Sequence, residues 1–355
     1  MESPLMFKCV KVYKRHAEEV LKVLRDFNLL AKGVKVKRVD DYVLIPVVDE
    51  VSEDELKDVL NNFNFAICED SFEKTTFKLS FKDILKDSIP PEVLDMIPNS
   101  YDIIGDIAII RLPSEALSYG PLIGEAISKV AKNVKVVYAS GFTEGPFRVK
   151  PLKHLFGEER SKTIHREYGI RMWVDVAKTY FNPSLAEEHK RIADFVKDGE
   201  VVGDLFCGVG SFTLHIVTRK KATVISVDLN PEAVKCLIDS LSLNFKNIIG
   251  VAIPMLADVG FALEVFKDNF FDRVIMNLPH EAFKYVPKAI EKVKCGGVLH
   301  VYSVARNPEE AVKQALENLT IEKVQVLSSS EVLEYAPRKY IYRVDLIKYC
   351  FNSSN

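Results

Sequence analysis

Asp204-Leu-Phe-Cys-Gly208-Val-Gly210-Ser-Phe212 is the stretch that decides the fold of this 355-residue chain. It follows an apolar run and precedes a helical pattern, which predicts a strand that ends in a turn on two glycines and opens into a helix. Glycine at Gly208 and Gly210 lets a ligand approach the backbone closely. The dinucleotide-binding fingerprint needs a third glycine where Thr213 stands, which argues against a nicotinamide dehydrogenase.

From about residue 172 to the end, short β-branched runs alternate with helical stretches. The strand-like runs are VVGDLF, TVISVD, IIGVAI, DRVIMN, VLHVYSV, EKVQVL and KYIYRVDLI. Strand–helix alternation of this kind predicts an α/β domain with a mostly parallel sheet and helices on both faces. Ligands of such sheets bind at the carboxyl ends of the strands.

Polar residues stand at the ends of the later strands. Asp228 could accept both hydroxyls of a ribose, Asp258 could receive the amino group of an adenine, and Asn277-Leu278-Pro279-His280 closes the fourth strand. Each feature also has a structural explanation, such as a tight turn, a helix cap or a strand exit. Together with Asp204 at the first strand, the set resembles the class I S-adenosylmethionine-dependent methyltransferase pattern, which implies a Rossmann-like fold.

The composition excludes several classes of protein. Hydrophobic residues make up 48% and charged residues 28%, which excludes a wholly disordered, collagen-like or membrane-embedded chain. No apolar run approaches the ~20 residues of a membrane-spanning helix, and we see no secretion signal. The six cysteines are scattered without a Cys-x-x-Cys pair. We therefore expect reduced cysteines, no metal site and a cytoplasmic protein.

Charge is unevenly distributed before the cofactor domain. Residues 1–48 hold ten Lys or Arg against six acids, residues 49–100 five against thirteen, and residues 146–171 seven against three. Two basic regions separated by an acidic one suit contact with a long polyanion at two places, although each could be a solvated face. We expect a basic N-terminal domain at 1–72, a middle α+β domain at 73–170 and a catalytic domain at 171–355.

The segment PFRVKPLKHLFGEERSKTIHREYGIRMWVDVAKTYFNPSLAEEHKRI, residues 146–192, carries a specific resemblance. It is similar to the segment that precedes the cofactor domain in the archaeal and eukaryotic tRNA (guanine-37-N1)-methyltransferase family. Ser100–Asp106 and Tyr335–Arg338 match as well, so the resemblance runs from about residue 100 to 347. The family implies a class I methyltransferase domain preceded by two smaller α+β RNA-binding domains, one at the tRNA elbow.

The resemblance also implies roles for individual residues. Glu188 would take the proton from N1 of guanosine 37, and Arg148 would stabilise the charge on O6. Asn277 and Pro279 would place the base edge, and Tyr180 would shape the pocket. The residues implied in binding S-adenosylmethionine are Asp204, Phe206, Gly208, Gly210, Asp228, Leu229, Asp258, Val259, Asn277 and His189. The expected partner is tRNA, through its anticodon loop and elbow, with no membrane, no protein partner and a monomeric chain.

One departure and three alternatives remain open. Many family members have Arg where this chain has His189, so any charge role at that position is in doubt. Some archaeal relatives methylate a carbon (C7) of the wyosine precursor at the same tRNA position, alone or as a second activity. Another relative transfers the aminocarboxypropyl arm of the cofactor, which the Asn277-Leu-Pro279 exit argues against. The last alternative is a non-catalytic RNA-binding protein.

Overall fold

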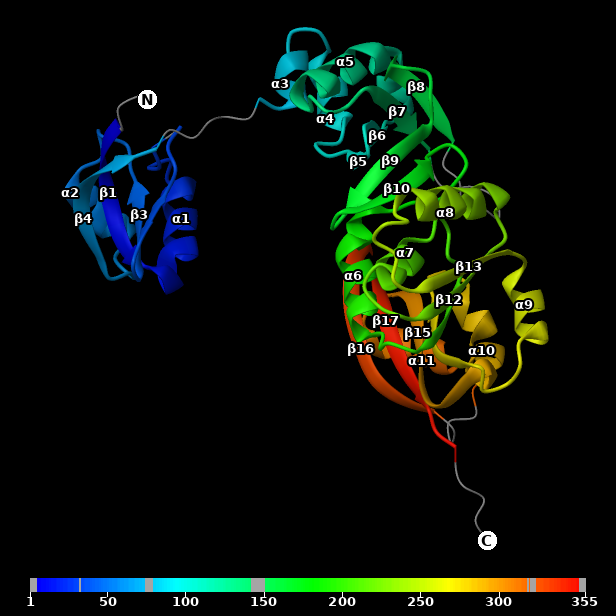
Figure 1. The fold of residues 1–355 in the computed structure, drawn as a ribbon. Coiled ribbons are helices and arrows are strands. Elements are labelled where there is room, and N and C mark those ends of the chain that lie inside the picture. Colours follow the sequence, from blue (N-terminus) through cyan, green and yellow to red (C-terminus); the bar gives the residue numbers. More distant parts are fainter. Residues whose placement is uncertain are drawn as a thin grey trace. The chain divides into compact units, whose positions relative to one another are not determined.

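The chain forms two compact units, Met1–Ser80 and Phe81–Asn355. The computed structural model describes residues 5–31, 33–73, 79–141, 151–317, 319 and 324–350 (Figure 1). The predicted catalytic domain, 171–355, lies within the second unit, as does the predicted middle domain, 73–170, apart from its residues 73–80. The predicted boundary between these two domains at residue 170 stays a prediction. Within the described ranges, no helix is both long and apolar enough to cross a bilayer.

The first unit is one antiparallel sheet covered by two helices. Its strands are β1 Leu5–Tyr13, β2 Lys37–Val39, β3 Tyr42–Pro46 and β4 Phe65–Phe72, in the order β2-β3-β1-β4, and its helices are α1 Ala17–Asp26 and α2 Glu53–Val59. Ser52 caps α2 by accepting the backbone N–H of Glu55 at 3.1 Å, as its position in a capping pattern predicts. The sequence analysis missed β4, because its side chains do not alternate cleanly between buried and exposed.

The second unit begins with a four-stranded sheet and its helices. The elements are α3 Phe81–Leu85, α4 Pro91–Met96, β5 Asp102–Ile104, β6 Ile107–Arg111, α5 Gly120–Val130, β7 Val136–Ser140 and β8 Leu152–Gly157. β5 and β6 pair antiparallel through a turn at Gly105, whose φ is +60°. Two further strands, β9 Lys162–Glu167 and β10 Ile170–Asp175, form a hairpin across Tyr168-Gly169, both at positive φ. The sequence analysis had treated β8 to β10 only as a basic run.

A seven-stranded sheet forms the rest of the second unit. Its strands are β11 Val201–Leu205, β12 Thr223–Asp228, β13 Val251–Leu256, β14 Phe271–Met276, β15 Val293–Ala305, β16 Val324–Ala336 and β17 Lys339–Lys348. The order is β13-β12-β11-β14-β15-β17-β16. The first five strands run parallel, and β17 and β16 are antiparallel additions. This confirms the predicted mostly parallel sheet, and the order reverses between β11 and β14, where ligands bind in such folds.

Helices cover both faces of this sheet (Figure 1). They are α6 Ala186–Phe195, α7 Ser211–Val217, α8 Pro231–Leu243, α9 Val259–Val265, α10 Val286–Lys292 and α11 Pro308–Leu316. The apolar sides of α6 and α7 pack with Val202, Ile275 and Tyr302 on one face. Those of α9, α10 and α11 pack with Leu205, Val274 and other strand residues on the opposite face. The sheet is therefore buried on both sides, as parallel sheets require.

The expectation that all six cysteines are reduced is wrong. Disulfides join Cys9 to Cys68 and Cys295 to Cys350, with Cα atoms 5.0 and 5.5 Å apart, while Cys207 and Cys236 are free and buried. The reason is sheet register. β1 and β4 place Cys9 directly opposite Cys68, and the β15–β17 register, extended past its last pair, brings the second pair together. Linear spacing cannot reveal such pairs.

Candidate active site

A cavity of about 330 Å³ lies at the carboxyl ends of β11, β12, β13 and β14. That size suits a small-molecule or cofactor site. Its lining residues come from the loops and the first helical turns that follow these strands and from the segment before α6. They are Tyr180, Phe206, Gly208, Asp228, Leu229, Asn230, Ala233, Asp258, Val259, Asn277, Leu278, Glu281 and Tyr285.

The turn after β11 and the end of β12 form one side of the cavity. The Gly208 N–H donates to Oδ2 of Asp228 at 2.7 Å, and the Asn230 N–H donates to Oδ1 at 2.8 Å. Burial raises the pKa of Asp228, although both backbone hydrogen bonds oppose that shift. Gly208 has φ +54°, and a Cβ there would meet nothing nearer than the Tyr180 carbonyl oxygen at 4.0 Å. The turn thus leaves room for a ligand beside a fixed carboxylate.

Two residues of the glycine motif lie behind the cavity and do not line it. Asp204 is fully buried. Its Oδ2 accepts hydrogen bonds from the Thr213 N–H at 3.2 Å and from the Thr213 hydroxyl at 2.7 Å. Burial raises the pKa of Asp204 to about 6. Gly210 has φ +84°, and a Cβ there would lie 2.3 Å from Cδ1 of Leu237 on α8. Both residues fix the turn against its helices.

The opposite side of the cavity carries the other predicted polar groups. Asp258 caps α9 by accepting the Phe261 N–H at 3.1 Å, and it remains exposed to the cavity. Asn277 and Leu278 line the wall directly after β14. Pro279 is buried behind them, and its carbonyl oxygen accepts the Val304 N–H at 3.1 Å. The Asn-Leu-Pro segment is therefore held on β15 with its amide side chain at the cavity.

The structure brings most of the predicted cofactor residues together. The predicted residues at the cavity are Tyr180, Phe206, Gly208, Asp228, Leu229, Asp258, Val259 and Asn277. Those that do not line it are Asp204, Gly210, Pro279, Glu188 and His189. Arg148 lies outside the described residues. Carboxylates at two strand ends, an open glycine turn and the Phe206 and Tyr285 rings 5.4 Å apart fit an adenosine-bearing cofactor such as S-adenosylmethionine.

Sequence reasoning missed five lining residues, Asn230, Ala233, Leu278, Glu281 and Tyr285. A signal existed for two of them. Asn230 stands before Pro231 as a helix cap, and its side-chain oxygen accepts the Glu232 N–H at 3.0 Å. Tyr285 lies within the first turns after the Asn-Leu-Pro exit. No sequence pattern separates Ala233 or Glu281 from ordinary helix residues.

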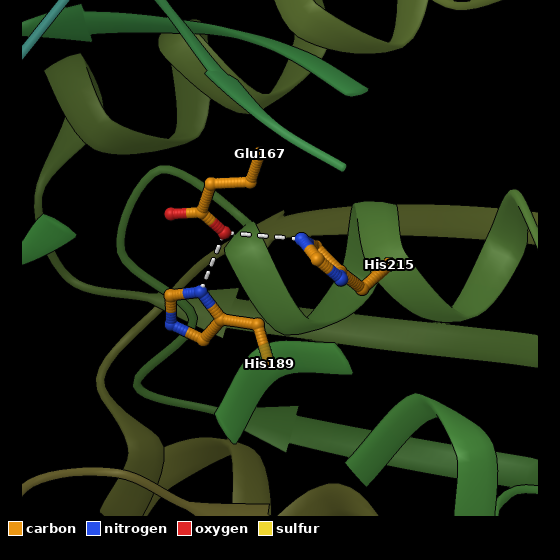
Figure 2. A group of neighbouring side chains, drawn as sticks. All are labelled: Glu167, His189 and His215. Carbon is orange, nitrogen blue, oxygen red and sulfur yellow. Dashed lines mark hydrogen bonds and ion pairs between the residues drawn. The ribbon is translucent and has the colours of Figure 1, made fainter. Parts of the chain in front are cut away.

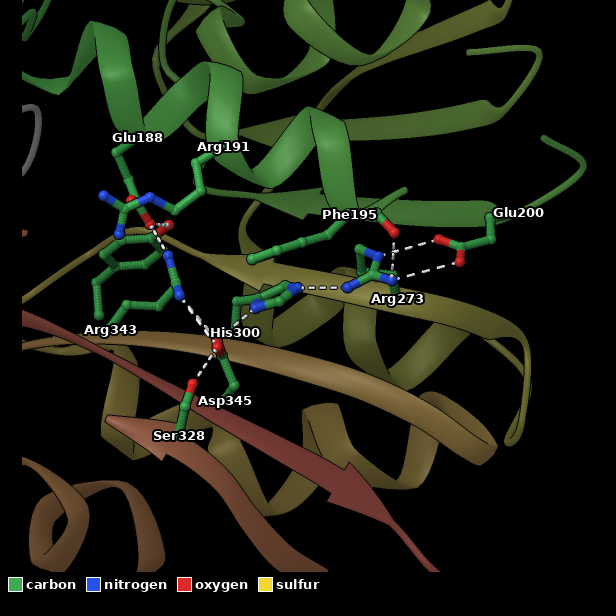
Figure 3. Close-up of polar contacts among 10 residues, drawn as sticks. Glu188, Arg191, Phe195, Glu200, Arg273, His300, Ser328, Arg343 and Asp345 are labelled. Atoms are coloured by element: carbon green, nitrogen blue, oxygen red, sulfur yellow. Dashed lines mark hydrogen bonds and ion pairs between the residues drawn. The ribbon is translucent and has the colours of Figure 1, made fainter. Parts of the chain in front are cut away.

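Glu188 lies in the first turn of α6, and only 3% of its surface is exposed. Its Oε1 accepts hydrogen bonds from the Tyr302 hydroxyl at 2.7 Å and from Nη1 of Arg343 at 2.6 Å. Its neighbour Glu187 bonds instead to the Tyr168 hydroxyl at the surface. Glu188 is thus the acid that points inward from this helix, and Figure 3 shows it beside Arg343. Its role as the base stays a prediction.

His189 belongs to a buried cluster with Glu167 and His215 (Figure 2). Oε2 of Glu167 lies 2.8 Å from Nδ1 of His189 and 3.0 Å from Nε2 of His215. Burial alone would raise the pKa of Glu167, but the two imidazole hydrogen bonds outweigh it and lower the pKa to about 2. The cluster joins β9, α6 and α7, so His189 serves packing and does not line the cavity.

Direct hydrogen bonds account for this cluster better than a metal ion. The three ligand atoms lie within 4.8 Å of one another, which a metal would also require. However, both rings bond to one carboxylate oxygen, and Nδ1 of His215 has no hydrogen-bond partner. A metal-bound imidazole normally donates its other N–H to an acceptor. The cluster therefore reads as a hydrogen-bonded part of the core.

The known proteins that this chain resembles agree with a cofactor site in the cavity. Residues 163–327 match the TRM5/TYW2 methyltransferase domain, residues 81–160 a TYW2 N-terminal domain, and residues 9–55 the tRNA methyltransferase 5 N-terminal domain. The Methanocaldococcus jannaschii tRNA (guanine(37)-N(1))-methyltransferase Trm5b is 37% identical over 95% of this chain and 97% of its own length. A tRNA(Phe) (4-demethylwyosine(37)-C(7)) aminocarboxypropyltransferase from Pyrococcus horikoshii is 29% identical over 76% of this chain and 96% of its own.

A solved structure extends the likeness to three dimensions. The complex of aTrm5 with tRNALeu is 36% identical, covers 96% of this chain and 99% of its own, and has a TM-score of 0.67. The class I methyltransferase fold, the cofactor cavity and the full-length similarity therefore lead to one conclusion: this chain belongs to the TRM5/TYW2 methyltransferase family.

Proposed function

We propose that the chain transfers a methyl group from S-adenosylmethionine to N1 of guanosine 37 in the tRNA anticodon loop. The observation that carries this proposal is the cavity, with Asp228, Asp258 and Asn277 at three strand ends, in a chain that is 37% identical to a relative named for this reaction. That relative matches 95% of this chain, whereas the aminocarboxypropyltransferase relative covers 76% of it.

Each lining group has a proposed part in the reaction. Asp228 and Leu229 would hold the ribose, Asp258 and Val259 the adenine, and Phe206 and Gly208 would receive the rest of the cofactor. S-adenosylmethionine supplies an activated methyl group when bound. Asn277 and Tyr180 would hold the target guanine, with Pro279 fixing the turn that presents Asn277. The base must leave its stack in the anticodon loop to reach the cavity.

Two further groups would act on the guanine itself. N1 of guanosine carries a proton at neutral pH, so a base must remove it, and Glu188 has this proposed role. Negative charge then moves towards O6, which Arg148 is proposed to stabilise. Once the proton has been removed, the rest of the proposed rate enhancement comes from positioning. The methyl carbon and N1 would be held in line for the transfer.

The direct test is methyl transfer to an unmodified tRNA transcript that carries guanosine 37, followed by nucleoside mass spectrometry. We expect 1-methylguanosine, and no product when guanosine 37 is replaced by adenosine. Cofactor consumption without a methylated guanosine would exclude the proposed target. A non-catalytic RNA-binding protein would give neither product nor binding of S-adenosylmethionine in calorimetry.

A second methylation is proposed as an additional activity on the wyosine precursor at the same position. The supporting observation is a Saccharolobus solfataricus tRNA 4-demethylwyosine(37)-methyltransferase Taw21 that is 32% identical over 57% of this chain. A transcript that bears the precursor would gain one methyl mass on its base if this activity exists. We place both reactions in the cytoplasm, the compartment predicted from the sequence, and propose that the enzyme works as a monomer that meets the tRNA elbow and anticodon loop.

A further inference from the structure

The proposed base, Glu188, is held from one side only. Two donors from two different strands, the Tyr302 hydroxyl on β15 and the Arg343 guanidinium on β17, both bond to Oε1, at 2.7 and 2.6 Å. Oε2 is buried and has no hydrogen-bond partner among the described residues. Nη1 of Arg191 lies 3.6 Å from it, an ion-pair distance beyond hydrogen-bond range.

A rigid chain of polar groups fixes the Arg343 side of this arrangement (Figure 3). Nε of Arg343 donates to both oxygens of Asp345, at 2.9 and 3.1 Å. Asp345 also accepts the Ser328 hydroxyl at 2.7 Å and Nδ1 of His300 at 2.6 Å. Burial alone would lower the pKa of Arg343, but the Asp345 and Glu188 carboxylates raise it above its ordinary value, so the guanidinium stays charged.

The far end of the chain determines the tautomer of His300. Nη1 of Arg273 lies 2.7 Å from Nε2 of His300, and a guanidinium can only donate, so Nε2 accepts and Nδ1 carries the proton. Arg273 is itself anchored by Glu200 at 3.0 Å and by the Phe195 carbonyl oxygen at 3.1 Å. Every group in this chain from Glu200 to Arg343 therefore has a hydrogen-bond partner in a fixed direction. These bonds hold the Arg343 side chain in one orientation.

Oε2 of Glu188 is the oxygen without a donor at the end of this bonded chain of described residues. Glu167 and Asp204 also keep one buried carboxylate oxygen without a described donor, so what distinguishes Glu188 is the chain of fixed groups behind Arg343. The described residues supply two donors to Oε1 and none to Oε2, although the groups facing Glu188 include three donors, Tyr302, Arg343 and Arg191. The asymmetry leaves the lone pairs of Oε2 available for an incoming proton.

We propose that Tyr302 and Arg343 are positioning residues that hold Oε1 of Glu188, so that Oε2 receives the proton of the target nitrogen. This inference rests on the proposed function. The N1–H bond of the guanine breaks, an O–H bond forms at Oε2, and the electron pair that remains on N1 forms the bond to the methyl carbon. The bond between that carbon and the sulfur of S-adenosylmethionine breaks at the same time, and its electron pair stays on the sulfur, which leaves as a neutral thioether. Tyr302 and Arg343 do not line the cavity, and in this proposal they act only through Glu188.

The test compares Tyr302→Phe with Tyr342→Phe in the full chain with a guanosine 37 transcript. Tyr342 is also buried but makes no described hydrogen bond to Glu188, so this control removes one tyrosine hydroxyl away from the proposed base. We expect Tyr302→Phe to lower kcat about 10-fold with KM for tRNA unchanged, which corresponds to one hydrogen bond in the transition state. The acid limb of the pH–rate profile of Tyr302→Phe should also move to higher pH. Tyr342→Phe should change neither.

A double-mutant cycle separates positioning from a merely structural effect. In a Glu188→Gln background, whose residual turnover is measured in single-turnover assays, Tyr302→Phe should cause no further loss. An equal 10-fold loss in both backgrounds would overturn the inference. Arg343→Lys is the second variant, because it keeps the charge but loses the fork that holds Asp345, and it should lower kcat in the same way. Wild-type kcat in both Tyr302→Phe and Arg343→Lys would also overturn it.

The two proposals fail in different ways. Full activity of Glu188→Gln would remove Glu188 as the base and with it the proposed mechanism. Loss of activity in Glu188→Gln, together with a wild-type kcat and pH profile in Tyr302→Phe, would leave the proposed function standing and reject only the positioning role.

Discussion

The backbone N–H of Gly208 donates a 2.7 Å hydrogen bond to Oδ2 of Asp228, so the turn after β11 and the acid at the end of β12 form a single unit. Both residues line the cavity. The bond fixes the carboxylate in the direction of the open glycine turn. Asn230 completes the unit, since its N–H holds the second carboxylate oxygen at 2.8 Å. Cofactor binding should therefore depend strongly on this one side chain.

Asp228→Ala should weaken S-adenosylmethionine binding on the order of 10- to 100-fold, the value of one or two hydrogen bonds to a charged group. Isothermal titration calorimetry measures the effect directly. Asp194→Ala is the control, because Asp194 is a surface acid paired with Lys190 and absent from the cavity. An unchanged dissociation constant for Asp228→Ala would remove this carboxylate from the cofactor site.

Asn277→Ala should lower the rate of methyl transfer by about 100-fold or more, while tRNA still binds. The reason is that the amide side chain lies at the cavity, where it would orient the target base, and misplaced reactants lose most of the benefit of proximity. Single-turnover kinetics with a guanosine 37 transcript gives the rate, and filter binding gives the tRNA affinity. Turnover at the wild-type rate would count against the whole site.

Gly210→Ala should destabilise the second unit by about 1–3 kcal/mol more than Gly169→Ala. The two glycines have nearly equal φ, +84° and +85°, so both substitutions carry the same left-handed strain. The two positions differ in the room for an added Cβ. At Gly210 it would lie 2.3 Å from Leu237, whereas at Gly169 none of the described atoms would lie within 4 Å of it. Denaturant unfolding of the two variants compares them, and equal losses would show that packing on α8 is unimportant.

Glu167→Gln should remove a pH-dependent part of the stability of about 3 kcal/mol. The folded pKa of Glu167 is lowered from 4.5 to about 2, so its contribution is complete above about pH 4.5 and is lost as the pH falls towards 2. The free energy of unfolding of wild type and variant should converge over that window. Fluorescence of Trp173, the single tryptophan, follows the unfolding.

Glu92→Gln, at an exposed position, is the control for this measurement and should leave the pH dependence of wild type intact. A constant difference between wild type and Glu167→Gln from pH 7 to 2 would mean that the carboxylate does not titrate with folding. Asp204 has a pKa raised from 3.8 to about 6, so its own pH-dependent contribution falls between those values. Wild type and variant both carry Asp204, so this contribution cancels in the comparison.

Local patterns predicted the sheet well, for identifiable reasons. The parallel strands are buried on both faces, and their β-branched runs, such as Thr223–Asp228, therefore stand out from the helices between them. The cofactor loops follow from this order, because parallel strands bring their carboxyl ends to one edge. Asp228, Asp258 and Asn277 could thus be placed together from the sequence.

Other features escaped the sequence because they depend on partners far along the chain. β4 is a strand by virtue of its pairing with β1, and its own residues do not alternate clearly. His189 looked like a substituted cofactor residue, but it faces Glu167, 22 residues earlier, and lies in the core.

The sequence by itself determined the class of fold, the order of its elements and the acids and amide that line the cofactor cavity, because each follows from a short periodic run and the residue that ends it. Only the tertiary structure decided which cysteines pair, which acid of Glu187 and Glu188 points inward, and which oxygen of Glu188 is left without a donor. Those depend on strand register and on side chains such as Arg343, 155 residues away, that meet only when the sheet has formed.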